Sequence, residues 1–197
     1  MTTGGSSAII VNAEESASVG GVYVLRIVVS TRVTVAFGAF ANGTPIVVEP
    51  GEYVYTGSAR SSRSGTSLAA RIIRHATRSG DLPPHQIRPE LIDTFDQIGF
   101  WNGRIPSGKK LFWNIDHLLD CPEAELAAVI ALFTSDRREG DVARYLENDP
   151  HTSYLAKGLG AHDIPGNTHL LRIDNVNVSW WENLADTLLS LVNRKAD

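Results

Sequence analysis

The chain has 197 residues, of which 43% are hydrophobic, so it is long enough to bury the core of one ordinary domain. Its formal net charge of -4 gives no global positive field that would favour a nucleic-acid or membrane partner. The single cysteine, Cys121, excludes an intramolecular disulfide and a zinc site built on several thiolates.

Residues 1–19 are rich in Ser, Gly and acidic side chains, which predicts a flexible lead-in. The short apolar run within them has no basic region before it, so it does not fit a signal peptide. Nowhere does the sequence contain the roughly 20 apolar residues needed to span a bilayer. We therefore expect a soluble, cytoplasmic protein with no membrane partner.

The first ordered elements are predicted to be strands. Residues 22–29 and 33–40 are β-branched and aromatic, and the Ser-Thr-Arg between them suits a tight antiparallel hairpin. Residues 45–57 supply a third strand, which Pro50-Gly51 interrupts. This strand ends unusually, because two tyrosines are followed by Gly57 and a loop rich in Arg and Ser.

Residues 65–80 have the clearest helical pattern. Thr66 or Ser67 can cap its start, and Gly80 can end it. Apolar residues recur at helical spacing on one face. The opposite face is predicted to carry a basic stripe made of Arg71, Arg74, His75 and Arg78.

Residues 79–109 are rich in Pro and Gly and are interpreted as an insertion, with a short helix within 89–101. The apolar run 125–133 fits a buried strand as well as a buried helix. The other expected elements are helices over 111–120, 137–149 and 181–195, and a loop followed by a strand over 158–173.

Charge is distributed unevenly along the chain. Between Gly57 and Trp113 there are nine Lys and Arg against four Asp and Glu, whereas residues 114–197 carry seven against fourteen. The basic middle is therefore the part of the chain that would contact phosphates.

Several motifs now stand in a recognisable order: Gly21-Val22-Tyr23, Tyr55-Thr56-Gly57, Arg71 with His75 one helical turn later, and a helix-borne Glu139. In this order they resemble the GIY-YIG nuclease superfamily. The segments "YVYTGSA", "RIIRHA", "FWNIDHLLD" and "SDRREGDVARYLEN" resemble its Uri-type branch, whose domains also occur fused to endonuclease III-type DNA repair enzymes.

The resemblance implies an α/β (α+β) fold with a small three-stranded antiparallel sheet flanked by helices. It covers a domain over residues 20–173, with the insertion at about 79–109 and a C-terminal helical extension over 174–197. It also implies that residues 125–133 form a core element.

The resemblance further implies a metal-dependent endonuclease that hydrolyses DNA phosphodiester bonds. Tyr23 and Tyr55 would flank the attacking water, and Arg71 would bind the phosphate with paired donors. His75 would donate a hydrogen bond or move a proton. Glu139 would hold Mg²⁺ or Mn²⁺, since hard cations often use few protein ligands beside substrate phosphate.

The predicted contacts with the nucleic-acid backbone lie around this constellation: Gly57, Ser58, Arg60, Arg63, Arg74 and Arg78. Gly57 is expected to let the backbone turn sharply at the end of its strand. For Arg74 and Arg78, a solvated helix face remains an equal alternative.

Two other functions remain open. Phe112 and Asn114 stand where Uri-type relatives have histidines, which favours a catalytically inactive nucleic-acid-binding module of the same fold as the alternative. The C-terminal helix, preceded by Trp180, could instead mediate self-association or bind a partner.

Overall fold

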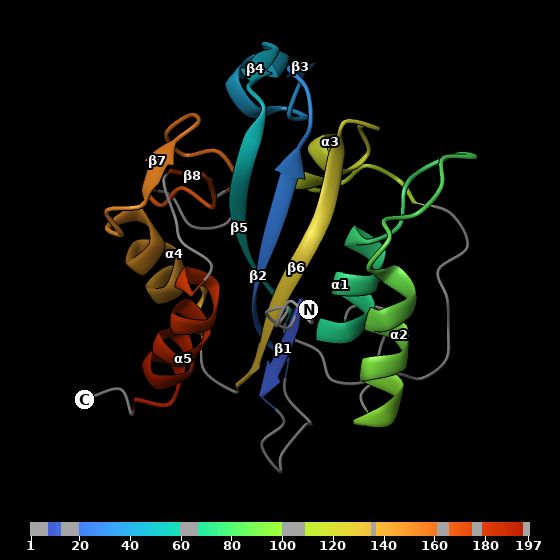
Figure 1. Ribbon diagram of the computed structural model, residues 1–197. Coiled ribbons are helices and arrows are strands. Elements are labelled where there is room, and N and C mark those ends of the chain that lie inside the picture. Colours follow the sequence, from blue (N-terminus) through green and yellow to red (C-terminus); the bar gives the residue numbers. More distant parts are fainter. Residues whose placement is uncertain are drawn as a thin grey trace, which may run out of the picture.

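The computed structural model describes residues 8–12, 20–59, 67–99, 109–134, 137–160, 166–174 and 179–194. A six-stranded sheet lies between two layers of helices (Figure 1). Its strands are β1 (Ile9–Asn12), β2 (Gly21–Val29), β5 (Gly51–Ala59), β6 (Ala124–Phe133), β7 (Thr152–Tyr154) and β8 (Leu170–Ile173). The helices are α1 (Leu68–His75), α2 (Arg88–Gln97), α3 (Asn114–Leu119), α4 (Glu139–Glu147) and α5 (Trp180–Val192).

The strands of the large sheet are ordered β1-β6-β2-β5-β8-β7, and only the β1–β6 pair is parallel. The expected three-stranded antiparallel sheet is therefore wrong, because the sheet is mixed and twice as wide. The ambiguous run 125–133 is strand β6, whose last residues are buried on both faces of the sheet. Ile9–Asn12, within the expected flexible lead-in, adds a further strand beside it.

The predicted hairpin between residues 22–29 and 33–40 is also wrong. Strand β2 pairs with β5 on one side and β6 on the other, so neither of its edges is free. Strand β3 (Val33–Val35) instead pairs with β4 (Ile46–Val48) in a separate two-stranded sheet. Between these two strands lies the 3₁₀ turn η1 (Phe40–Gly43).

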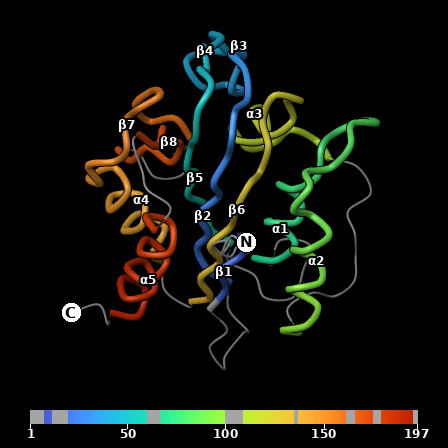
Figure 2. The backbone as a smooth tube through the Cα atoms, viewed as in Figure 1, coloured from blue at the N-terminus to red at the C-terminus, as the bar shows by residue number. Residues whose placement is uncertain are grey.

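The two faces of the large sheet have separate cores, because side chains alternate along each strand. On β2, Tyr23, Leu25 and Ile27 pack with residues of α1, α2 and α3. Val22 and Val24 point to the other face and pack with residues of α4 and α5. Figure 2 shows the two groups of helices on opposite sides of the sheet. Side chains of α1 and α4 therefore meet at one place only if they reach around a sheet edge.

Helix α1 begins as the sequence predicts and ends earlier. The Ser67 side chain accepts a hydrogen bond from the Ala70 backbone N–H at 3.2 Å, which caps the first turn. The helix ends at His75, five residues before Gly80. Among the described residues, no helix has the length and apolar character that crossing a bilayer would require.

Candidate active site

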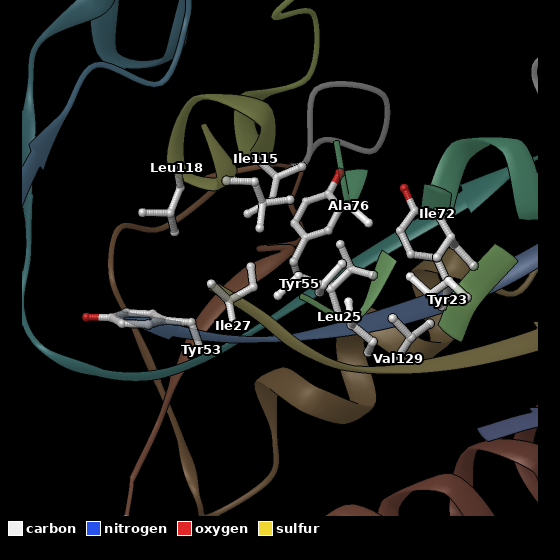
Figure 3. Close-up of a cluster of buried hydrophobic side chains, with 14 of the residues drawn as sticks. Tyr23, Leu25, Ile27, Tyr53, Tyr55, Ile72, Ala76, Ile115, Leu118 and Val129 are labelled. Atoms are coloured by element: carbon white, nitrogen blue, oxygen red, sulfur yellow. The ribbon is translucent and has the colours of Figure 1, made fainter. Parts of the chain in front are cut away.

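Two tyrosines define the floor of the candidate site. Tyr23 on β2 and Tyr55 on β5 point to the face covered by α1 and α3, and their ring centroids are 6.4 Å apart. Figure 3 shows their hydroxyl oxygens on the same side of the sheet, whereas the Tyr53 ring points away from them. Tyr23 is 1% exposed and Tyr55 is 5% exposed.

Gly57 makes room for the Tyr23 ring. The two residues are paired across β2 and β5, and a Cβ at Gly57 would lie 2.3 Å from Tyr23 Oη. The expected sharp turn at Gly57 is wrong, because this residue lies inside β5. Its small size is required by a close approach of the phenol rather than by backbone conformation.

The Tyr23 hydroxyl is the first member of a buried hydrogen-bonded chain. Its Oη lies 2.8 Å from Nε2 of His75, and Nδ1 of His75 lies 3.2 Å from Asp116 Oδ1. All three side chains are almost fully buried. An ionised carboxylate only accepts hydrogen bonds, so Nδ1 of a neutral His75 carries the proton and Nε2 accepts the bond from Tyr23.

Burial sets the protonation states of the first two members. It lowers the pKa of His75, against the opposing effect of Asp116, so the imidazole is neutral near pH 7. Burial raises the pKa of Tyr23 well above its ordinary value, and the nearby Tyr55 adds to this effect. Tyr23 is therefore a phenol in the resting protein.

Asp116 organises the cations behind His75. Arg74 donates to both of its carboxylate oxygens, at 3.0 and 2.8 Å, and Lys109 Nζ lies 3.6 Å away. The backbone N–H groups of Phe112 and Trp113 also donate to it, which caps the start of α3. Although burial alone would raise the pKa of Asp116, hydrogen bonds and charges, led by His75, hold it far below its ordinary value.

Ser58 joins the two faces of the sheet at the edge of β5. Its backbone carbonyl accepts a hydrogen bond from Arg71 Nη1 of α1 at 2.6 Å. Its hydroxyl donates at 2.5 Å to Oε2 of Glu139, which is the first residue of α4. The edge is open here because the β8 ladder covers Glu52–Tyr55 and the bond that follows it, from Thr56 N–H to His169 O, lies two residues before Ser58. Arg71 and Glu139 are both partly exposed, so an anion from solvent can approach them.

Two further side chains complete the surroundings. His169 Nδ1 lies 3.6 Å from Glu139 Oε1, and its ring meets Tyr55 edge-on with centroids 6.4 Å apart. The Arg71 guanidinium stacks on the Trp113 ring, 4.5 Å from the centroid. This contact holds the cation beside the phenols without neutralising its charge.

The structure brings together Tyr23, Tyr55, Arg71, His75 and Glu139, along with Gly57 and Ser58. Arg74 lies next to them, but its charge is engaged by Asp116.

Arg78 lies elsewhere, because α1 ends before it and the helical spacing no longer applies. It is buried and binds Ala124 O and Glu125. Arg60 and Arg63 lie outside the described residues.

Among the described residues, Glu139 is the carboxylate that the sequence prediction assigns to a metal and that the structure places at this site. The described residues contain no group of three or more His, Cys, Asp or Glu placed to hold an ion. Asp141, its nearest competitor in the sequence, pairs with Arg138 and Arg144. A single partly exposed carboxylate fits Mg²⁺ or Mn²⁺ only in the form that keeps most of its waters and binds substrate phosphate.

Sequence reasoning assigned no role to Asp116, Trp113 or His169. Asp116 and Trp113 belong to the segment "FWNID", and an acidic residue at the third position of a helix is a sequence signal for capping. His169 lies just before β8, and only the fold brings it to Tyr55.

Comparisons with known proteins give a family and no named relative. No curated protein and no solved structure matches the chain. The family model that matches is not that of a GIY-YIG nuclease, so the sequence-based assignment to that superfamily is corrected. The match runs from residue 22 to residue 190 and so includes most of α5. The chain belongs to the family described as domain of unknown function DUF123.

Proposed function

We propose that the protein is a metal-dependent phosphodiester hydrolase that acts on DNA. One observation carries the proposal: the Tyr23 hydroxyl is hydrogen-bonded to the His75–Asp116 pair, beside a partly exposed guanidinium and a partly exposed carboxylate. Phosphodiester hydrolysis needs a proton acceptor for the attacking water and positive charge near the phosphoryl oxygens. The side chains described above supply both.

Arg71 binds the phosphate. A guanidinium has five N–H donors, and the bond to the Ser58 carbonyl uses one of them. Its stacking on Trp113 fixes the plane of the group, which favours paired hydrogen bonds to phosphate oxygens.

Tyr23 and His75 move the proton. Since the Tyr23 phenol is protonated, its oxygen can accept a proton from water only as it gives up its own. The water proton passes to Tyr23 Oη, and the phenolic proton passes to Nε2 of His75, 2.8 Å away. The imidazolium that forms is stabilised by Asp116 at Nδ1. Tyr55, whose ring lies beside Tyr23, orients the water.

Glu139 would hold the divalent ion, and such an ion would supply Lewis-acid stabilisation of the phosphate and of the departing oxygen. The hydrogen bond from Ser58 keeps this carboxylate turned toward the edge of β5. His169 approaches the same carboxylate from the other side.

A second function, nucleic-acid binding without turnover, is favoured by the burial of Tyr23. With 1% of the residue exposed, a water must enter between Tyr23 and Tyr55 before the phenol can act. A module that only binds would need Arg71 and would be unaffected by loss of the Tyr23 hydroxyl.

The test is a cleavage assay of the full chain on end-labelled single-stranded, duplex and branched DNA with Mg²⁺ or Mn²⁺. Tyr23→Phe and Glu139→Gln should each reduce the rate by roughly 100-fold or more, as expected for loss of a proton-transfer group or metal ligand. Tyr53→Phe is the matched control, since Tyr53 is a buried tyrosine on β5, the strand next to that of Tyr23, and its hydroxyl donates to Glu49 O outside the site.

The proposal is supported if cleavage requires the metal, is lost in Tyr23→Phe and Glu139→Gln, and is retained in Tyr53→Phe. Absence of cleavage on all three substrates, together with binding that needs Arg71, would support the binding module instead. Cleavage that survives Tyr23→Phe unchanged would reject the proposed proton transfer.

A further inference from the structure

Phe112 is an aromatic side chain held in solvent next to the candidate site. It is 74% exposed, which makes it the most exposed of the large hydrophobic side chains in the described part of the chain. Leu111, just before it, is 40% exposed, and Lys110 is exposed as well. An apolar surface of this kind beside a polar site commonly marks a place where a ligand binds.

The backbone under Phe112 is fixed by hydrogen bonds. Its N–H donates to Asp116 Oδ2 at 3.0 Å, and the N–H of Trp113 donates to the same oxygen at 2.9 Å. The carbonyl of Lys110 accepts a hydrogen bond from Arg74 Nη2 at 2.5 Å. The exposure of the ring is therefore a property of an anchored segment.

Ring contacts connect Phe112 to the phosphate-binding group through Trp113. The Phe112 ring meets the Trp113 ring edge-on, with centroids 4.8 Å apart. The Trp113 ring in turn lies 4.5 Å from the Arg71 guanidinium carbon. Trp113 therefore links the exposed ring of Phe112 to the guanidinium of Arg71, and proteins that track a single strand combine such base-stacking and phosphate-binding groups.

We propose that Phe112 is a stacking platform for an unpaired nucleobase of the strand whose phosphate Arg71 binds. The inference rests on the proposed function and narrows its substrate to DNA that is single-stranded or has an unpaired base near the scissile phosphate. Bases inside a duplex already stack on both neighbours, so an exposed ring gains little from them. Lys110 and Arg71 supply the positive charge that the strand needs.

The test is fluorescence anisotropy with labelled oligothymidine and with a blunt duplex of equal length, in EDTA so that no cleavage occurs. Phe112→Ala should weaken binding of the single strand by roughly 5- to 100-fold, which is the effect of losing one stacked base, and that of the duplex by less than about 2-fold. Phe112→Trp keeps an aromatic ring at this position and should bind the single strand as tightly as the wild type does.

Two controls separate stacking from other causes. Tyr154→Ala removes an aromatic ring that is 45% exposed and lies beside a cation, Lys157, but belongs to β7. It should leave both affinities unchanged. On an oligonucleotide without bases, the wild type and Phe112→Ala should bind equally.

Equal losses on single-stranded and duplex DNA would overturn the platform, and so would an unchanged affinity for the single strand. A change in the solution mass of the protein on Phe112→Ala would assign the ring to self-association instead. If Phe112 is needed for binding of the single strand but no cleavage depends on Tyr23, the proposed function is refuted and the stacking platform is supported. Cleavage with normal binding by Phe112→Ala refutes the platform alone.

Discussion

Replacement of Asp116 by Asn tests the organisation of the site most directly. The wild-type carboxylate accepts bonds from Arg74 and His75 on Oδ1, and from Arg74 and two backbone N–H groups on Oδ2. Asn keeps one acceptor and replaces the other with an NH₂ donor. In either orientation, a donor of the new amide therefore faces at least two donors of the protein.

The expected cost follows from burial and charge. Removal of one partner from a buried ion pair costs about 3–5 kcal/mol, because the remaining charge stays uncompensated. Arg74 is 21% exposed at its side chain and can turn partly to water, whereas Lys109 is buried beside Asp116. We therefore expect a loss of about 3 kcal/mol in the free energy of unfolding at pH 7, near the lower end of that range.

Urea denaturation at pH 7 measures this loss. Asp96→Asn on α2 is the matched control, because Asp96 is exposed, and it should change the free energy of unfolding by less than about 0.5 kcal/mol. A cost for Asp116→Asn below about 1 kcal/mol would refute the reasoning, since it would mean that neither the charge nor the hydrogen bonds of this carboxylate are needed. In the absence of urea, where Asp116→Asn is still folded, the rate of any DNA cleavage should also be lower than that of the wild type.

Three further predictions concern stability. Gly57→Ala should cost about 1–3 kcal/mol in urea denaturation, because its Cβ collides with Tyr23, and it should cost much less in a Tyr23→Leu background. Arg78→Met should destabilise by about 2–4 kcal/mol, since it removes the donor of the Ala124 carbonyl and the buried cation that pairs with Glu125, yet DNA binding by the folded variant should be unchanged. Burial lowers the pKa of His85 to about 4, so its neutral form stabilises the fold above pH 6.5. This contribution to the free energy of unfolding is lost, at about 1.4 kcal/mol per pH unit, as the pH falls from 6.5 to 4. A free energy of unfolding that stays constant over this window would contradict the prediction.

The local part of the site could be predicted from the sequence. Tyr23 and Leu25 share one face of β2, and Tyr53 and Tyr55 share one face of β5, because side chains alternate with a period of two. His75 follows Arg71 by one turn of a well-capped helix. These relations depend only on spacing within an element, which is what periodicity encodes.

The rest depended on choices that a single sequence leaves open. After Glu125, the run to Phe133 is entirely apolar, so neither helical nor strand periodicity decides between a helix and a strand. Pairing of β2 with β6 joins segments a hundred residues apart, and this pairing excludes the local hairpin. Helical spacing predicts Arg78 on the basic stripe only if the helix continues to that residue, and α1 ends at His75. Asp116 reaches His75 only after α3 packs against α1.

The site also explains why β8 is short. Ser58 can bind Arg71 through its carbonyl and Glu139 through its hydroxyl only because the edge of β5 is unpaired at that point. If β8 paired with β5 three residues further, as far as Ser58, its backbone would occupy the place where the guanidinium approaches. The cation from one helical layer and the carboxylate from the other would then be separated by the sheet. An early end to the β5–β8 ladder is therefore a condition for assembling the two charges at one surface.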